Sequence, residues 1–144
     1  MPRTRVEVDA QPEIIEDYVE ADLKYFGWIE SKLVGLRYYN AQVSEGQSVI
    51  FSREPDNSND QLAIRADNMY GEQVGYIGRS DAMVLAPLID FGYIILKGYV
   101  HQEPNFYDVP VTIKIFGPPE REDFATIRML SKGVMFNFPG SSNN

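Results

Sequence analysis

From Tyr25 onward, the chain is divided into short runs rich in Val, Ile, Tyr and Phe, and turn-forming residues separate these runs every 8 to 12 positions. This spacing is typical of a small sheet or barrel built from short sequential strands. The chain has 144 residues, which is near the commonest size of a single domain. We therefore expect one domain with one core and a mainly β fold.

Period-2 alternation of side chains predicts about six strands. They cover residues 32–39, 47–53, 62–67, 73–77, 93–101 and 109–117. Gly71 is placed for a tight turn into the fourth strand, which predicts a hairpin there. In the first strand, Tyr38 shares a face with Val34 and Leu36, so the pattern is compatible both with a core role for Tyr38 and with a stacking role.

Two short helices are expected beside these strands. Ser80 can cap a helix from Asp81, and Pro87 should kink or end it because proline lacks an amide hydrogen. A second helix opens at the two prolines 118–119 and closes near Gly133. Three apolar residues recur on one side of it and should dock on the barrel: Phe124, Ile127 and Leu130. The expected fold is a six-stranded OB-like or SH3-like small barrel with two short helices.

Composition excludes several kinds of site. The chain has no cysteine and a single histidine, His101, so thiolate metal sites and histidine clusters are ruled out, and we expect no metal and no cofactor. The net charge of −8 speaks against a bulk electrostatic grip on nucleic acid. Any nucleic-acid site must therefore be local.

Charge also divides the chain. Residues 1–31 carry eight acidic and three basic residues, which accounts for −5 of the net charge of −8. We interpret residues 1–24 as a flexible acidic arm, 25–136 as the domain, and 137–144 as a flexible tail or the start of a linker. No apolar run approaches the roughly 20 residues that cross a bilayer, and the N-terminus has no signal-peptide pattern. We therefore expect an intracellular protein without membrane contact.

Enzyme motifs are missing from the sequence. It has no phosphate loop, no dinucleotide-binding glycine motif, no nucleophile elbow and no HExxH. His101 has no nucleophile motif near it, and helix capping and solvation explain the acidic clusters. We therefore expect a binding domain and not an enzyme.

Three segments depart from simple core-and-turn patterning. They are VGLRYY (34–39), REPDNSNDQLAI (53–64) and the weaker GEQVGYIGR (71–79). Together they resemble the HIRAN domain, and the resemblance covers residues 25–136. The first two segments at this separation form a specific signature, whereas either one alone would be moderate.

The resemblance implies a function as well as a fold. HIRAN domains are six-stranded OB-like barrels with two helices that capture the 3′-hydroxyl end of single-stranded DNA. They occur in nuclear, SWI/SNF-type ATP-dependent translocases that are also ubiquitin ligases and act at stalled replication forks. The ATPase motifs and the cysteine-rich RING finger are absent here, so the sequence corresponds to the DNA-reading module alone, which we expect to be a monomer joined covalently to those domains.

The resemblance also assigns roles to residues. Asp60 stands where a carboxylate accepts the hydrogen bond of the terminal hydroxyl. Arg37 and Arg79 could hold the flanking phosphates, and Tyr38 and Tyr39 could stack on the terminal bases. A further tyrosine, Tyr76, could pack across the sheet or form a wall of the pocket.

Two positions depart from the family pattern. Asn59 replaces the aromatic residue that vertebrate members carry one position before the loop aspartate, so one stacking surface is lost or replaced by an amide. A second aromatic, in the loop after the fifth strand, corresponds to either Phe106 or Tyr107.

Simpler explanations stand beside these assignments. Arg37 could pair with a loop acid, Asp60 could cap its turn, and Asn57 fits a role in turn architecture. The acidic arm and Asn59 motivate a second function, a protein-interaction barrel that keeps the fold without binding DNA ends. A nuclease with metal ions at Asp56 and Asp60 is a third, weaker hypothesis.

Overall fold

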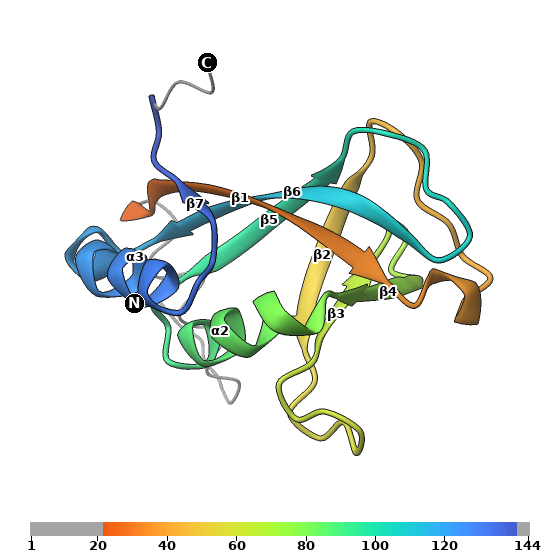
Figure 1. The fold of residues 1–144 in the computed structure, drawn as a ribbon, viewed down its shortest axis with the longest axis horizontal. Coiled ribbons are helices and arrows are strands. Elements are labelled where there is room, and N and C mark those ends of the chain that lie inside the picture. Colours follow the sequence, from red (N-terminus) through yellow and green to blue (C-terminus); the bar gives the residue numbers. More distant parts are fainter. Residues whose placement is uncertain (1–21, 141–144) are drawn as a thin grey trace.

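An antiparallel sheet dominates the computed structural model, which describes residues 22–140 (Figure 1). Its strands are β1 (Lys24–Val34), β2 (Ser48–Arg53), β3 (Ile64–Asp67), β4 (Gln73–Ile77), β5 (Ile95–Val100), β6 (Asp108–Gly117) and β7 (Phe136–Asn137). They are hydrogen-bonded in the order β4-β3-β2-β5-β6-β1-β7, and β4 also pairs with β1. Six strands thus close into a barrel and β7 lies on the outside edge of β1, which confirms the mainly β barrel with two short helices.

Strand β1 has three neighbours because β6 pairs along its whole length, while β7 pairs at Trp28 and Ile29 and β4 pairs at Leu33 and Val34. The pairing of β1 with β6 shifts register between Tyr25 and Gly27. Gly27 has φ 149°, and a Cβ there would lie 2.1 Å from the carbonyl oxygen of Asn137 in β7. Only glycine therefore lets β7 pass this close to β1, and β7 was not predicted from the sequence.

Alternating side chains of the strands fill the barrel. In β6, the inward residues Val109, Val111, Ile113 and Ile115 are fully buried, as their alternation predicted. Phe26 of β1 joins the same core. Burial of such branched side chains is the main source of stability of a barrel this small.

The first predicted strand, residues 32–39, is displaced from β1, because it misses residues 24–31 and continues past the end of the observed strand. β1 ends at Val34, where Gly35 adopts φ 76°, and Leu36–Tyr38 form the 3-10 helix η2. A left-handed residue turns the chain out of the sheet, and glycine adopts this conformation at little cost. Tyr38 is 69% exposed, so the core role for Tyr38 is wrong.

The helix α2 (Arg79–Asp90) begins two residues earlier than predicted. Its N-cap is Gly78, and no side chain caps it, so the predicted cap at Ser80 is wrong. The amide of Gly78 donates to the carbonyl of Lys32, which fixes the turn before the helix. Pro87 lies inside α2, and the helix ends three residues later, where few backbone bonds remain to be lost.

The last helix presents the opposite face to the one expected. A short 3-10 helix, η3 (Pro119–Arg121), leads into α3 (Glu122–Ser131). Ala125 and Met129 are fully buried, whereas the three residues predicted to dock are 48%, 63% and 46% exposed: Phe124, Ile127 and Leu130. Small Ala125 lets the helix approach the barrel closely, and the amide of Val134 donates to the carbonyl of Met129 as the chain returns towards β7.

The ends of the chain fall largely outside the described part. The expectations for the acidic arm and the tail concern residues 1–21 and 141–144 for the most part. Among residues 22–140, no helix is long and apolar enough to cross a membrane.

Candidate nucleic-acid interface

Arg37 and three aromatic residues form an exposed group, here called the cation–aromatic cluster: Arg37, Tyr38, Phe106 and Tyr107. Arg37 Nη2 donates to Tyr38 Oη at 2.6 Å, and its guanidinium carbon lies 4.5 Å from the Tyr38 ring centroid. The same carbon lies 5.2 Å from the Tyr107 ring, and Phe106 meets Tyr107 edge-on at 5.1 Å. Arg37 forms no ion pair within residues 22–140, so the suggested pairing with a loop acid is wrong.

Backbone and amide contacts hold this cluster in place. The amide of Leu36 donates to the carbonyl of Tyr107, which joins η2 to the β5–β6 loop. Asn105 Oδ1 accepts hydrogen bonds from the amides of Tyr107 and Asp108 at 2.7 and 2.8 Å. The aromatic rings are therefore presented to solvent by a backbone that is itself hydrogen-bonded, an arrangement suited to stacking on bases or to other flat ligands.

The loop between β2 and β3 is organised by Asn57. Its Oδ1 accepts hydrogen bonds from the amides of Asn59 and Asp60 at 2.8 and 3.1 Å. This confirms Asn57 as a turn residue, and its Nδ2 also donates to Glu54 and to Tyr76 Oη. The Asn59 side chain, in the place of the family's aromatic, is exposed on this turn.

Asp60 uses its two carboxylate oxygens differently. Oδ1 accepts a hydrogen bond from the amide of Leu62 at 2.9 Å, so Asp60 does cap its turn. Oδ2 lies 3.7 Å from Nε of Arg79, the first residue of α2, whose side chain is 75% exposed. Oδ2 receives no hydrogen bond from the described residues, and it remains available to a donor from outside.

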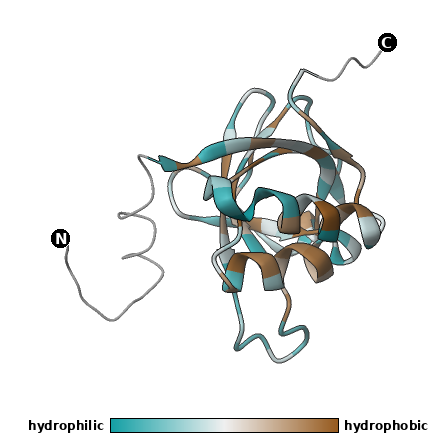
Figure 2. Cartoon of the chain, turned by 90° about the vertical axis from the view of Figure 1, so that its left-hand side faces the viewer, coloured by the Kyte–Doolittle hydropathy of each residue, from teal (hydrophilic) through white to brown (hydrophobic). Residues whose placement is uncertain are grey.

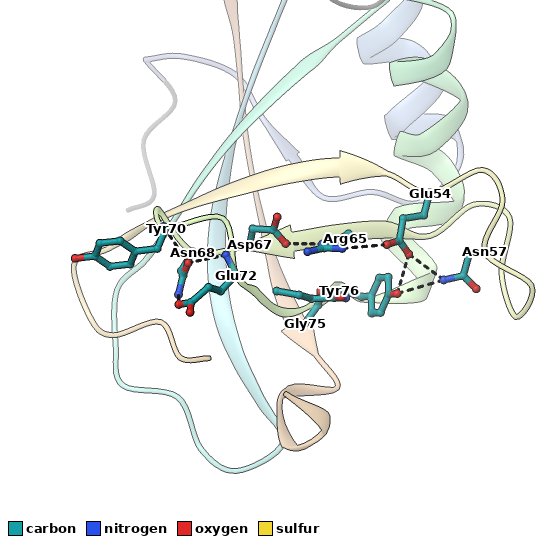
Figure 3. A network of polar contacts seen from close by, with 10 residues as sticks. Glu54, Asn57, Arg65, Asp67, Asn68, Tyr70, Glu72, Gly75 and Tyr76 are labelled. Carbon is teal, nitrogen blue, oxygen red and sulfur yellow. Dashed lines mark hydrogen bonds and ion pairs between the residues drawn. The ribbon is translucent and has the colours of Figure 1, made fainter. Parts of the chain in front are cut away.

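A half-buried polar network stands behind this turn (Figure 3). Tyr76 Oη and Asn57 Nδ2 both donate to Glu54 Oε1, at 2.7 and 3.0 Å, and Arg65 lies 3.8 Å from Oε2. Burial opposes ionisation of Glu54, but these two hydrogen bonds and the charge of Arg65 outweigh it and lower the pKa of the carboxyl. The network fixes the Tyr76 ring and the loop in one arrangement.

Tyr39 connects the network to the cation–aromatic cluster. Its ring lies edge-on to Tyr76 with centroids 6.4 Å apart, and it directly follows Tyr38 in the chain. Burial, followed by the neighbouring Tyr76 phenol, raises the pKa of Tyr39 to about 12. Tyr39 is therefore a neutral hydroxyl donor at physiological pH. Because its ring is half-buried, it is better placed to line the side of the site than to stack on a base.

Strand pairing explains why these segments meet. Val34, at the end of β1, is paired with Tyr76 of β4, so η2 starts beside the strand that leads to Arg79. The predicted site residues fall into two groups of contacts. Phe106 and Tyr38 belong to the cation–aromatic cluster around Arg37, whereas Tyr39 and Tyr76 adjoin the turn of Asp60. The two groups are joined by the peptide bond between Tyr38 and Tyr39. The sequence did not single out Glu54, Arg65 or the pairing of Tyr107 with Arg37, although Glu54 lies inside the quoted signature and at turn spacing from Asn57.

Metal chemistry finds no support in the described residues. Within residues 22–140, no group of three or more His, Asp or Glu side chains could hold a metal ion. The metal-dependent nuclease hypothesis, with ions at Asp56 and Asp60, therefore has no ligand set among these residues.

Comparison with known proteins agrees with this geometry. A family model described as the HIRAN domain matches residues 26–119. The chain belongs to the HIRAN domain family. The mouse helicase-like transcription factor is 32% identical to this HIRAN domain over 115 residues, or 79% of the chain, but only 12% of that relative is covered.

Two solved structures share the fold over most of the chain. The crystal structure of the HIRAN domain of human HLTF superposes with a TM-score of 0.77 and 27% identity, covering 82% of this chain and 98% of that one. The NMR structure of the HLTF HIRAN domain in its DNA-bound conformation gives a TM-score of 0.71 and 29% identity, covering 82% and 97%. This chain therefore matches nearly the whole length of both solved HIRAN domains.

Proposed function

We propose that this HIRAN domain binds single-stranded DNA and captures its 3′-hydroxyl end. The cation–aromatic cluster supplies a phosphate partner, Arg37, and exposed rings for unstacked bases. A structural neighbour of this family is known in a DNA-bound conformation, which supports DNA as the ligand.

The observation that carries the proposal is that Oδ2 of Asp60 receives no hydrogen bond from residues 22–140. Arginines accept any phosphate and aromatic rings accept any base, so neither distinguishes a strand end from its interior. Oδ2 faces Arg79 at 3.7 Å but receives no hydrogen bond from the described residues, so it can accept one from a terminal hydroxyl while Oδ1 holds the turn. Arg79, beside it, would hold the adjacent phosphate.

A conservative variant of Asp60 tests this. In Asp60→Asn the side-chain carbonyl oxygen can still accept the Leu62 amide, so the turn is kept while the charge is removed. A charge-assisted hydrogen bond contributes about 1.5–3 kcal/mol, which corresponds to roughly ten- to a hundredfold in affinity. We expect Asp60→Asn to lose most of the preference for a 3′-hydroxyl over a 3′-phosphate, measured by fluorescence anisotropy with one labelled oligonucleotide sequence.

Three results of this titration have different meanings. Equal wild-type affinity for the two ends would refute end capture while leaving strand binding in place. An unchanged preference in Asp60→Asn would assign the hydroxyl to another group. Absence of any binding at low salt, where phosphate contacts are strongest, would instead favour the protein-interaction barrel, for which the acidic N-terminal residues and Asn59 are the motivation.

The larger assembly is part of the same proposal. The chain covers only 12% of the mouse relative, so the domain in that relative is part of a much longer protein. We infer that this HIRAN domain likewise serves a longer nuclear protein, an ATP-dependent translocase with a ubiquitin-ligase RING domain. Its role there is to direct that protein to strand ends at stalled forks. Comparing the fork association of the complete protein with and without Asp60→Asn would test this.

A further inference from the structure

Two lysines stand directly opposite each other on the outer face of the sheet. Lys97 of β5 is the register partner of Lys114 of β6, and both residues are exposed. Like charges at directly opposite positions destabilise a strand pair, because their Cβ atoms lie only about 5 Å apart. Neither lysine forms an ion pair with another residue of the described part, 22–140. The barrel therefore concentrates positive charge here, in a chain whose net charge is −8.

Aromatic rings lie beside the lysine pair. Lys97 Nζ lies 5.4 Å from the centroid of the Phe116 ring, and Lys114 Nζ lies 5.5 Å from that of Tyr99. Trp28 of β1 is the second register partner of Lys114. The three aromatic residues are half-buried, so part of each remains open to solvent. We call these five residues the lysine–aromatic face: Trp28, Lys97, Tyr99, Lys114 and Phe116.

The acidic residue of the neighbouring row is engaged elsewhere. Glu30 of β1 is paired with Thr112 of β6, whose hydroxyl donates to the Glu30 carboxylate at 2.9 Å. Glu30 forms no ion pair with Lys97 or Lys114. A ligand that neutralises the two lysines must therefore bring its own negative charge. Lysines interleaved with flat rings suit single-stranded nucleic acid, whose phosphates need cations and whose unstacked bases need rings.

The lysine–aromatic face is connected to the candidate nucleic-acid interface by the strands themselves. β1 leads into η2 with Arg37, and β5 leads into β6 through the loop of Phe106 and Tyr107. Lys114 follows Asp108, the first residue of β6, by six positions, which is about 20 Å in an extended strand. Figure 2 views the barrel from the side of α2 and α3, and the exposure of the lysines shows that the helices leave this face open.

We propose that a single DNA strand whose 3′ end is captured continues over the lysine–aromatic face. Its phosphates lie against Lys97 and Lys114, and its bases lie against the rings of Tyr99, Phe116 and Trp28. This path rests on the proposed function, which supplies the held end. An OB-type barrel covers roughly 4–16 nucleotides of a single strand, so the footprint is expected to extend beyond the end itself.

Salt-dependent titration of the 144-residue chain tests this path. Oligothymidylates of about 4 and about 12 nucleotides, both with a 3′-hydroxyl, separate the end from the path. In the double variant Lys97→Gln/Lys114→Gln, the slope of log affinity against log salt should fall by about 1.4 for the longer oligonucleotide, since each lost phosphate contact removes about 0.7. The slope for the shorter oligonucleotide should stay unchanged.

The matched control for this variant is Arg128→Gln/Lys132→Gln. It also removes two positive charges, from exposed residues in and directly after α3 that form no ion pair within residues 22–140. The control should keep the wild-type slope for both oligonucleotides. Circular dichroism shows that each variant is folded.

Trp28 gives a second readout, because it is the only tryptophan of the chain. We expect the longer oligonucleotide to quench its fluorescence and the shorter one to leave it nearly unchanged. The double lysine variant should show clearly less quenching by the longer oligonucleotide at equal saturation.

The possible outcomes separate this path from end capture. A wild-type slope that does not depend on length, or equal losses in the double variant and the control, would overturn the path and leave end capture in place. An acidic protein segment would then be the better ligand for the two lysines. Equal affinity for a 3′-hydroxyl and a 3′-phosphate with an intact length effect would overturn end capture and support the face as a strand-binding surface. Absence of binding by both oligonucleotides at low salt would overturn both proposals.

Discussion

The guanidinium of Arg79 faces one oxygen of the Asp60 carboxylate at 3.7 Å, while the backbone amide of Leu62 occupies the other at 2.9 Å. A single side chain thus holds the turn and presents a charged acceptor next to an exposed cation. Asp60 therefore combines a structural role in the turn with the proposed role in binding the 3′ end. Separate variants are needed to measure each role.

Stability should respond to the turn-holding oxygen. Asp60→Ala leaves the Leu62 amide without its acceptor and should lower the free energy of unfolding by about 1 kcal/mol. Asp60→Asn should lower the free energy of unfolding by clearly less, because its side-chain oxygen can still accept the Leu62 amide. Urea denaturation followed by circular dichroism measures both, and equal losses would show that the pairing with Arg79, not the turn, carries the stabilisation.

Arg37→Ala should weaken binding of single-stranded DNA without unfolding the domain, because Arg37 has no ion pair among the described residues. Removing one phosphate contact should reduce the slope of log affinity against log salt by about 0.7. Arg121→Ala, at the far end of the barrel near Phe91, is the control with a matched charge change. An unchanged slope in Arg37→Ala would place Arg37 outside the phosphate contacts.

Tyr38→Ala should lower affinity for single-stranded DNA by roughly 1–3 kcal/mol, the range for loss of one base–aromatic stack. The midpoint of thermal unfolding should barely change, since the Tyr38 ring is 69% exposed. Tyr70→Ala, at least as exposed but outside the cluster, should leave affinity unchanged. Anisotropy titrations of the two variants side by side decide whether Tyr38 contacts a base.

Glu54 makes the stability of the domain depend on pH. Its pKa in the folded chain is lowered from 4.5, so its contribution is fully present above pH 4.5 and is lost as pH falls through the lower folded value. Glu54→Gln should therefore reduce the steepness of acid unfolding in this pH window. Parallel urea titrations at several pH values test this, and identical pH profiles would mean that Glu54 titrates alike in both states.

Gly35→Ala should destabilise the domain by about 1 kcal/mol, because the φ of 76° at this position is unfavourable for a residue with a Cβ. Space is not the obstacle, since the nearest atom to that Cβ, in Tyr38, is 3.8 Å away. DNA affinity should fall together with stability as η2 moves. Loss of stability with full affinity would show that the position of η2 is not critical.

Local pattern was sufficient for the barrel but not for its irregular positions. The alternation of β6 is clean because one face of the strand lines the core throughout, from Val109 to Ile115. At Gly35 the alternation continues through Leu36 and Tyr38, and nothing local shows that the glycine has left the extended conformation. The start of β1 was also missed, because the register shift between Tyr25 and Gly27 interrupts the alternation of side chains there.

The orientation of α3 depends on tertiary contacts. Apolar residues occur on both sides of this helix, and Ala125 with Met129 forms a second stripe that competes with the larger one. The prediction chose the face with the larger apolar side chains. The other face is buried because close approach of α3 to the barrel requires small or adaptable side chains. The site residues near Asp60 came from a family signature. The hairpin of β3 and β4 was predicted from the turn at Gly71, but the bond between Glu54 and Tyr76 also depends on how the loop between β2 and β3 lies beside β4, which one sequence does not reveal.

The closure of the barrel between β1 and β4 rests on two residue pairs, Leu33 with Ile77 and Val34 with Tyr76. Immediately beyond this short seam stand η2 on one side and Arg79 on the other. A ligand that contacts both η2 and Arg79 should stabilise the pairing of β1 with β4. Local opening of this pairing would move η2 and Arg79 apart. Amide hydrogen exchange at these four residues is therefore a direct gauge of occupancy, slowing when a strand end is held and accelerating when it leaves.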